Sequence, residues 1–132
     1  MRIVLDTNVL ISGIYFSGPP GRILAAWRSG TLQLAVSIEI LEEYLNVAER
    51  LASRYSGVEY EGILGLIIQN AQLVQGADLP EPVSEDPDDD KFLACALASN
   101  TRIIVSGDSD LLKVSGYADI RVLAKGIYLQ VP

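Results

Sequence analysis

The sequence predicts a three-layer α/β/α sandwich, in which helices cover both faces of a mainly parallel central sheet. Apolar strand-like runs alternate with stretches of helical spacing along the whole chain, from RIVL near the N-terminus to IRVL near the C-terminus. Strands separated by helices pair in parallel, and their continuous apolar character indicates burial on both sides. The length of 132 residues suits one domain, so we expect a single domain over residues 1–132.

The first half of the chain supplies two strands and two helices. The run at 2–5 is the first strand, and a short helix-like stretch follows it. Pro and Gly then mark a turn before a helix at 19–30, where apolar residues recur at helical spacing. LQLAVS at 32–37 is the second predicted strand.

A long helix is predicted from Ser37, whose hydroxyl suits the N-cap position. Its apolar positions form one stripe, made of Ile40, Leu41, Tyr44, Leu45, Ala48, Leu51 and Ala52. A further helix over about 59–70 leads into the short strand LVQ.

The second half begins with an acidic, Pro-containing stretch at 78–90, which holds seven of the seventeen acids and is expected to be mostly a solvated loop. An N-terminally acidic helix follows over 88–100. TRIIVS at 101–106 is a buried strand, SDLLKV at 109–114 a single helical turn, and IRVL at 120–123 the last strand.

Composition excludes several chemistries. The chain has no histidine and one cysteine, Cys95, which excludes Ser-His and Cys-His nucleophile pairs, internal disulfides and Cys-rich metal sites. A net charge of −7 gives no general attraction to nucleic acid. No apolar run reaches the roughly 18 residues of a membrane span, and signal-peptide features are missing. We therefore expect a soluble cytoplasmic protein without membrane association, which uses carboxylates, hydroxyls, amides or a metal.

Polar side chains follow two of the predicted strands. Asp6 comes directly after the first strand, and Ser106, Asp108 and Asp110 come after the strand TRIIVS. Sites in open α/β sheets form outside the carboxyl ends of the strands. If both strands are central and parallel, these side chains converge at one edge.

Two helices can bring further acids to that edge. On a helical wheel, Glu39 and Glu42 lie farthest from the apolar stripe, whereas Glu43 and Glu49 lie at its borders. The wheel does not choose between Glu43 and Glu49.

The acidic start of the later helix leaves a second choice open. Asp89 and Asp90 stand where helical angles need not hold, so either could point inward. An acid at this position can also serve only as a helix N-cap or complement the helix dipole.

Three separated segments of the chain resemble PIN-domain proteins, in particular the PIN toxins related to VapC. They are LDTNVLIS, SIEILEEYLNVAERL and DPDDDKFLACALASNTRIIVSGDSDLL. The resemblance implies metal-dependent ribonuclease activity with a catalytic, metal-binding quartet of Asp6, Glu43, Asp90 and Asp108. It implies Asp110 as an accessory metal ligand, and Thr7, Asn8 and Ser106 as polar residues that orient carboxylates or waters. It thereby selects Glu43 and Asp90 from the two open pairs.

The resemblance also sets the expected chemistry and partners. Oxygen ligands without His or Cys suit Mg²⁺ or Mn²⁺, so we expect hydrolysis of an RNA phosphodiester by metal-activated water. Arg22, Arg28 or Lys91 could add contacts to phosphate. An antitoxin protein and a homodimer are implied by the toxin family. The C-terminal LAKGIYLQVP lacks the Ser/Thr-Pro start of a final helix that many relatives have, which leaves that element and its dimer contacts undefined.

Two other function classes remain open. A phosphatase of the haloacid dehalogenase type also begins with a strand and an Asp, but its motif is DxDxT, and Asn8 stands in place of the second Asp. A non-catalytic RNA- or protein-binding PIN module would be marked by loss of acids, and all four mapped acids are present.

Overall fold

The centre of the molecule is a sheet of five parallel strands in the order β3-β2-β1-β4-β5. This computed structural model describes residues 1–15, 18–54 and 60–124. The strands are β1 (Arg2–Leu5), β2 (Gln33–Ser37), β3 (Gln72–Val74), β4 (Ile103–Val105) and β5 (Arg121–Leu123). β1 is the middle strand, with β2 on one side and β4 on the other, so the predicted α/β class with a parallel sheet is confirmed.

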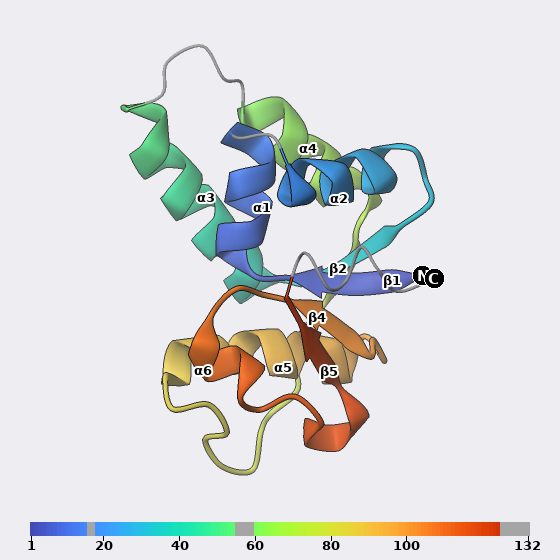
Figure 1. Cartoon of the computed structure of the whole chain (residues 1–132), viewed down its shortest axis with the longest axis vertical. Coiled ribbons are helices and arrows are strands. Elements are labelled where there is room, and N and C mark those ends of the chain that lie inside the picture. The colour runs from blue at the N-terminus through green and yellow to red at the C-terminus, as the bar shows by residue number, and fades with distance from the viewer. Residues whose placement is uncertain (16–17, 55–59, 125–132) are drawn as a thin grey trace.

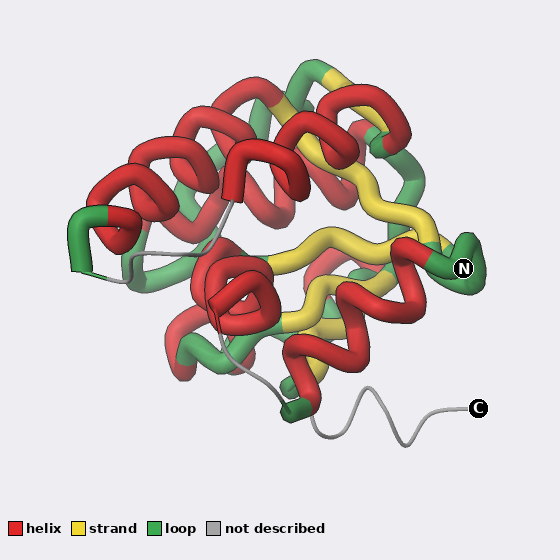
Figure 2. The backbone as a smooth tube through the Cα atoms, turned by 90° about the horizontal axis from the view of Figure 1, so that it is seen from above, coloured by secondary structure: helices red, strands yellow, loops and turns green. Residues whose placement is uncertain are grey.

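Helices cover both faces of this sheet, with α1 to α4 on one face and α5 and α6 on the other (Figure 1). They are α1 (Thr7–Tyr15), α2 (Pro19–Arg28), α3 (Ile38–Ala52), α4 (Tyr60–Asn70), α5 (Asp90–Ala98) and α6 (Ser109–Leu112). Two short 3-10 turns, η1 (Pro87–Asp89) and η2 (Tyr117–Asp119), precede α5 and β5. Seen from above, the strands run through the interior with helices outside them (Figure 2).

The core lies between the strands and the helices on both faces. Ile3, Val4 and Leu5 of β1 are at most 1% exposed, as expected for a central parallel strand. From the α5 side, Phe92 and Leu93 are also at most 1% exposed. Each large apolar side chain buried in this way contributes roughly 1.5–3 kcal/mol to folding. This packing fixes the carboxyl ends of β1 and β4, on which the candidate site is built.

One close helix contact depends on a glycine. A Cβ on Gly13 of α1 would lie 2.7 Å from the carbonyl oxygen of Pro20 and 2.8 Å from the Leu24 side chain of α2. Those distances are too short for any larger residue without movement of backbone. Gly13 therefore lets α1 and α2 pack against each other.

Most element boundaries agree with the sequence predictions to within a few residues. Ser37 caps α3 as predicted, because its Oγ accepts a hydrogen bond from the Ile40 backbone N–H at 3.2 Å. The predicted apolar stripe of α3 is too wide, since Leu45 is 36% exposed. The C-terminal segment 125–132, whose final element the sequence left open, lies outside the described residues. Within the described ranges, no helix combines the length and the apolar character that crossing a bilayer requires.

Candidate metal centre

The carboxyl ends of β1 and β4 bring two acids together, as the strand pattern predicts. The strands pair in parallel with Leu5 opposite Val105, so the residues that follow them lie side by side. Ser106 Oγ donates to Asp6 Oδ2 at 2.6 Å and accepts from the Asp108 backbone N–H at 2.9 Å. Ser106 therefore links the two acids and orients the Asp6 carboxylate.

Helix α3 brings Glu43 to the same edge. Its carboxylate accepts a hydrogen bond from the Thr7 hydroxyl at Oε2 and one from Lys91 Nζ at Oε1, the latter at 2.5 Å. Glu42, its neighbour, is exposed, and so is Glu49. Of the two acids that the helical wheel selected, the structure brings Glu43 to Asp6 and leaves Glu49 in solvent.

The acidic start of α5 places Asp89, and not Asp90, at this edge. Asp90 accepts hydrogen bonds from the backbone N–H groups of Ser84 at 2.8 Å and Val83 at 3.1 Å, which hold its side chain against the preceding loop. Asp89 ends the η1 turn, and one oxygen each of Asp89, Asp108 and Asp110 lie within 4.8 Å of one another. The resemblance selected Asp90 as the inward acid, but in the structure Asp89 takes that place. Two backbone amides hold the Asp90 carboxylate away from the edge of the sheet.

These residues line a cavity of about 300 Å³ at the carboxyl edge of the sheet. Its walls carry six carboxylates, together with Thr7, Asn8 and Val47. The acids are Asp6, Glu43, Asp86, Asp88, Asp89 and Asp108. Asp6 is 5% exposed, so at least one of these charges is well removed from water. Repulsion among so many like charges destabilises the folded protein unless protons or cations neutralise them.

The pKa values reflect this crowding. Burial raises the pKa of Asp6, and hydrogen bonds from Ser106 and the Asn8 backbone N–H lower it in part. Burial raises the pKa of Asp89 to about 8, and its interaction with Asp108 adds to the rise. The pKa of Asp108 is lowered, first by its hydrogen bond with Asp89. These opposite shifts favour the protonated form of Asp89 and the ionised form of Asp108.

The donor set fits a hard divalent cation. Oδ2 of Asp89 is buried and receives no hydrogen bond from any donor in the described part of the chain, so a cation, a proton or a water molecule can satisfy it. The cavity offers carboxylate oxygens and no nitrogen or sulfur ligand, which suits Mg²⁺ or Mn²⁺. Asp6, Asp89 and Asp108 would hold such an ion, with Asp110 beside them.

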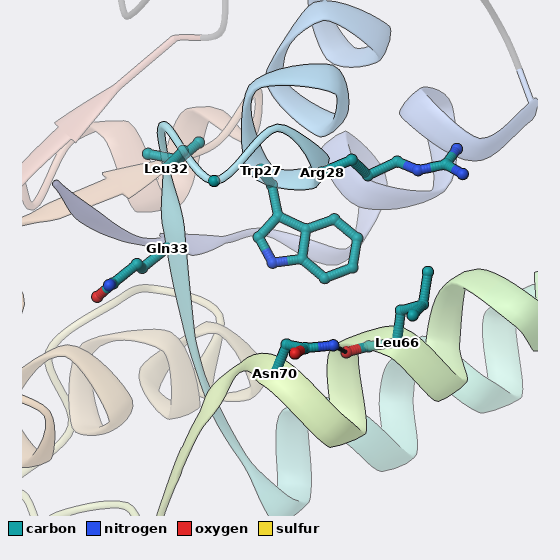
Figure 3. A pocket seen from close by; sticks show the side chains of 7 residues that line it. Trp27, Arg28, Leu32, Gln33, Leu66 and Asn70 are labelled. Carbon is teal, nitrogen blue, oxygen red and sulfur yellow. Dashed lines mark hydrogen bonds between the residues drawn. The ribbon is translucent and has the colours of Figure 1, made fainter.

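A second cavity, of about 510 Å³, is larger but has different chemistry. Trp27 of α2 faces Leu66 and Asn70 of α4 across it, and the Arg28 side chain extends away from the indole (Figure 3). Among the described residues that line this cavity there is no carboxylate, and Arg28 is the one charged residue. Trp27 itself is 8% exposed and belongs to the hydrophobic core. The carboxylates that could bind a metal ion therefore line the smaller, acidic cavity.

Comparison with known proteins assigns the chain to a family. The family model described as a PIN domain matches residues 2–110. The chain belongs to the PIN domain family. The matched range includes all six carboxylates of the cavity.

Solved structures support the fold of this PIN domain. The structure of VapBC2 from Rickettsia felis, bound to a DNA fragment from their promoter, resembles it with a TM-score of 0.59. The alignment covers 94% of this chain and 98% of that chain, at 13% sequence identity. Among curated proteins, none has a sequence that matches this one significantly. At this identity the likeness concerns the fold.

Sequence reasoning missed two acids of this PIN domain's cavity and the role of one lysine. Asp86 and Asp88 line the cavity and are exposed, which agrees with the expectation that most of this stretch is solvated. Asp86 also caps η1 by accepting from the Asp88 backbone N–H at 3.1 Å. The only sequence feature that could have indicated their position is the high density of aspartates in DPDDD. Lys91 was one of three cations that could contact phosphate, and in the structure it pairs with Glu43.

Proposed function

We propose that this PIN domain is a metal-dependent endoribonuclease that hydrolyses RNA phosphodiester bonds. The observation that carries the proposal is the cavity lined by six carboxylates at the carboxyl edge of the sheet. Four of them come from separate parts of the chain, namely the end of β1, helix α3, the η1 turn and the segment after β4. A purely structural role would not need so many like charges facing one cavity.

We propose Asp6, Glu43, Asp89 and Asp108 as the catalytic acids, with Asp110 as an accessory. Asp89 replaces Asp90 in this set because its Oδ2 is buried without a donor, whereas both oxygens of Asp90 accept backbone hydrogen bonds. Asp90 then supports the site indirectly by holding the loop at Val83 and Ser84.

Residues around the cavity would orient the catalytic carboxylates and the RNA. A divalent cation bound here lowers the pKa of water and offsets the charge of the phosphate. Ser106 holds Asp6, Thr7 holds Glu43, and the exposed Asn8 at the cavity wall can donate an amide hydrogen bond to the RNA. The cavity's acidity requires that cations accompany the RNA phosphate, because the chain carries a net charge of −7.

The activity is tested with two adjacent glutamates of α3. Glu43→Gln keeps size and hydrogen bonding but removes a charge from the cavity, and should reduce Mn²⁺-dependent cleavage of single-stranded RNA by orders of magnitude. Glu42→Gln, on the exposed side of the same helix, should leave cleavage intact and change stability by no more than about 0.5 kcal/mol. Equal cleavage by both variants would show that this cavity is not the catalytic centre.

We further propose that the chain acts as the toxin of a toxin-antitoxin pair and forms a homodimer. Support comes from the fold shared with a solved VapBC2 complex. Co-expression with the product of a neighbouring gene should give a stable complex that suppresses RNA cleavage, and light scattering should give twice the mass of the chain. An adjacent product that neither binds nor inhibits would argue against the toxin role.

A further inference from the structure

Glu43 is held by a lysine from the opposite helical layer. Lys91 Nζ donates to Glu43 Oε1 at 2.5 Å, while the Thr7 hydroxyl donates to Oε2. Lys91 lies in the first turn of α5 and Glu43 in α3, on opposite faces of the sheet (Figure 1). The ion pair therefore joins the two layers at the edge of the sheet where the acidic cavity lies.

Lys91 approaches Glu43 from outside that cavity. It does not line the acidic cavity but an adjoining groove, together with Asp90 and Ala94. Its ammonium group lies 5.8 Å from the centre of the Phe92 ring. The side chains of Lys91 and Glu43 are 20% and 30% exposed, so solvent screens this pair less than a surface ion pair.

Lys91 is also the one cation that forms an ion pair with a cavity carboxylate among the described residues. Lys113 is 63% exposed, and its Nζ lies 3.9 Å from both Asp110 and Glu85, neither of which lines the cavity. A positive charge at Glu43 reduces repulsion among the carboxylates of the metal-free protein. The same charge opposes the entry of a divalent cation beside Glu43.

We propose that Lys91 is the resident counter-ion of the metal-free centre. It neutralises and orients Glu43 until a divalent cation enters, and it thereby sets the affinity of the site for that cation. Lys91 acts through Glu43 and is a positioning residue. This inference rests on the proposed function, because it requires the cavity to bind a metal.

The test is Mn²⁺ binding to purified Lys91→Met, measured by isothermal titration calorimetry. Removing the charge should tighten Mn²⁺ binding by about tenfold, since one repulsive charge near the ion is lost. The melting temperature without metal should fall by a few degrees, because the cavity loses its counter-ion. Lys91→Arg restores a cation and should return both values toward the wild type.

Arg102→Met is the control, because it removes a positive charge that is 61% exposed and pairs with Asp119, at the other end of β4 from the cavity. Its Mn²⁺ affinity should change by less than about twofold, as expected for a screened surface charge. If Lys91→Met does not fold, Lys91→Gln, which keeps a donor to Glu43, is measured with the same expectations.

Three results would overturn the inference. Unchanged or weaker Mn²⁺ binding by Lys91→Met would refute the proposed role of Lys91, and would leave the proposed metal site standing. Equal tightening of Mn²⁺ binding by Arg102→Met would show that the net charge of the protein, and not the contact of Lys91 with Glu43, sets the affinity. Failure of both the wild type and Lys91→Met to bind Mn²⁺ would refute the proposed metal site, and this inference with it.

Discussion

At the scale of single residues, the orientation of Asp89 and Asp90 decides which carboxylate enters the cavity. The helical wheel left this pair open, since helical angles do not apply reliably at the start of a helix, and the resemblance to PIN toxins selected Asp90. The deciding contacts are the backbone N–H groups of Val83 and Ser84, which bind Asp90. Those amides belong to an irregular loop whose path no periodic pattern predicts.

Asp89→Asn and Asp90→Asn should therefore have different consequences. Asp89→Asn removes a carboxylate that can ionise to bind the cation, and should abolish the rise in melting temperature that Mn²⁺ produces. Metal-free stability should be kept, because the raised pKa of Asp89 already favours its neutral form when no metal is bound. Asp90→Asn weakens two hydrogen bonds and should cost about 1–2 kcal/mol, with the metal response retained. Calorimetric melting with and without Mn²⁺ measures both. The opposite assignment of the two phenotypes would restore Asp90 as the metal ligand.

The proton on Asp89 predicts a pH dependence of metal binding. Its pKa is raised to about 8, so below that pH the metal-free protein holds a proton that the cation must displace. Mn²⁺ affinity should rise between pH 6 and pH 8 by up to about tenfold per pH unit. Without metal the sign is opposite: the folded state holds a proton that the unfolded state has lost above its ordinary pKa of 3.8, so stability falls toward pH 8.

Titration calorimetry at several pH values measures this dependence, and Asp89→Asn is the control. That variant lacks the titrating carboxyl group, so its residual Mn²⁺ affinity should change much less with pH. A steep dependence that persists in the variant would place the proton on another group.

At the scale of elements, helix α3 connects the sheet to the cavity. Ser37 ends β2 and caps α3, which sets where the helix begins. Tyr44 is fully buried, and its hydroxyl donates to the Leu5 carbonyl oxygen at 2.5 Å, just before Asp6. Glu43 is therefore held in register with the end of β1. The sequence pattern predicted this helix well, because over its fifteen residues the apolar positions gather on one side of a helical wheel.

Tyr44→Phe should weaken this connection. It leaves the Leu5 carbonyl without the Tyr44 donor, so we expect a loss of about 1–2 kcal/mol in the free energy of unfolding. Because Glu43 is the next residue, Mn²⁺ affinity should fall as well. Chemical denaturation and titration calorimetry measure the two effects. Loss of stability with unchanged metal affinity would show that Tyr44 supports the core and not the position of Glu43.

At the scale of the whole molecule, the parallel sheet explains why distant segments form one site. Asp6 and Ser106 are about 100 positions apart in sequence, yet lie side by side because β1 and β4 are parallel neighbours. The alternation of apolar strands and helices predicted this convergence. The contacts of Lys91, and the place of the exposed Asp86 and Asp88 at the cavity wall, could not be predicted, because they depend on how the two helical layers and the acidic loop pack.

The central claim is that the acidic cavity holds a divalent cation, and anomalous X-ray diffraction from crystals grown with Mn²⁺ tests it most directly. We expect an anomalous peak within coordination distance of Asp6, Asp89 and Asp108, on the cavity side of Glu43. Coordination distances for such a hard cation are about 2.0–2.2 Å. No peak in this cavity at saturating Mn²⁺, or a peak bound by Asp90 and not by Asp89, would contradict it.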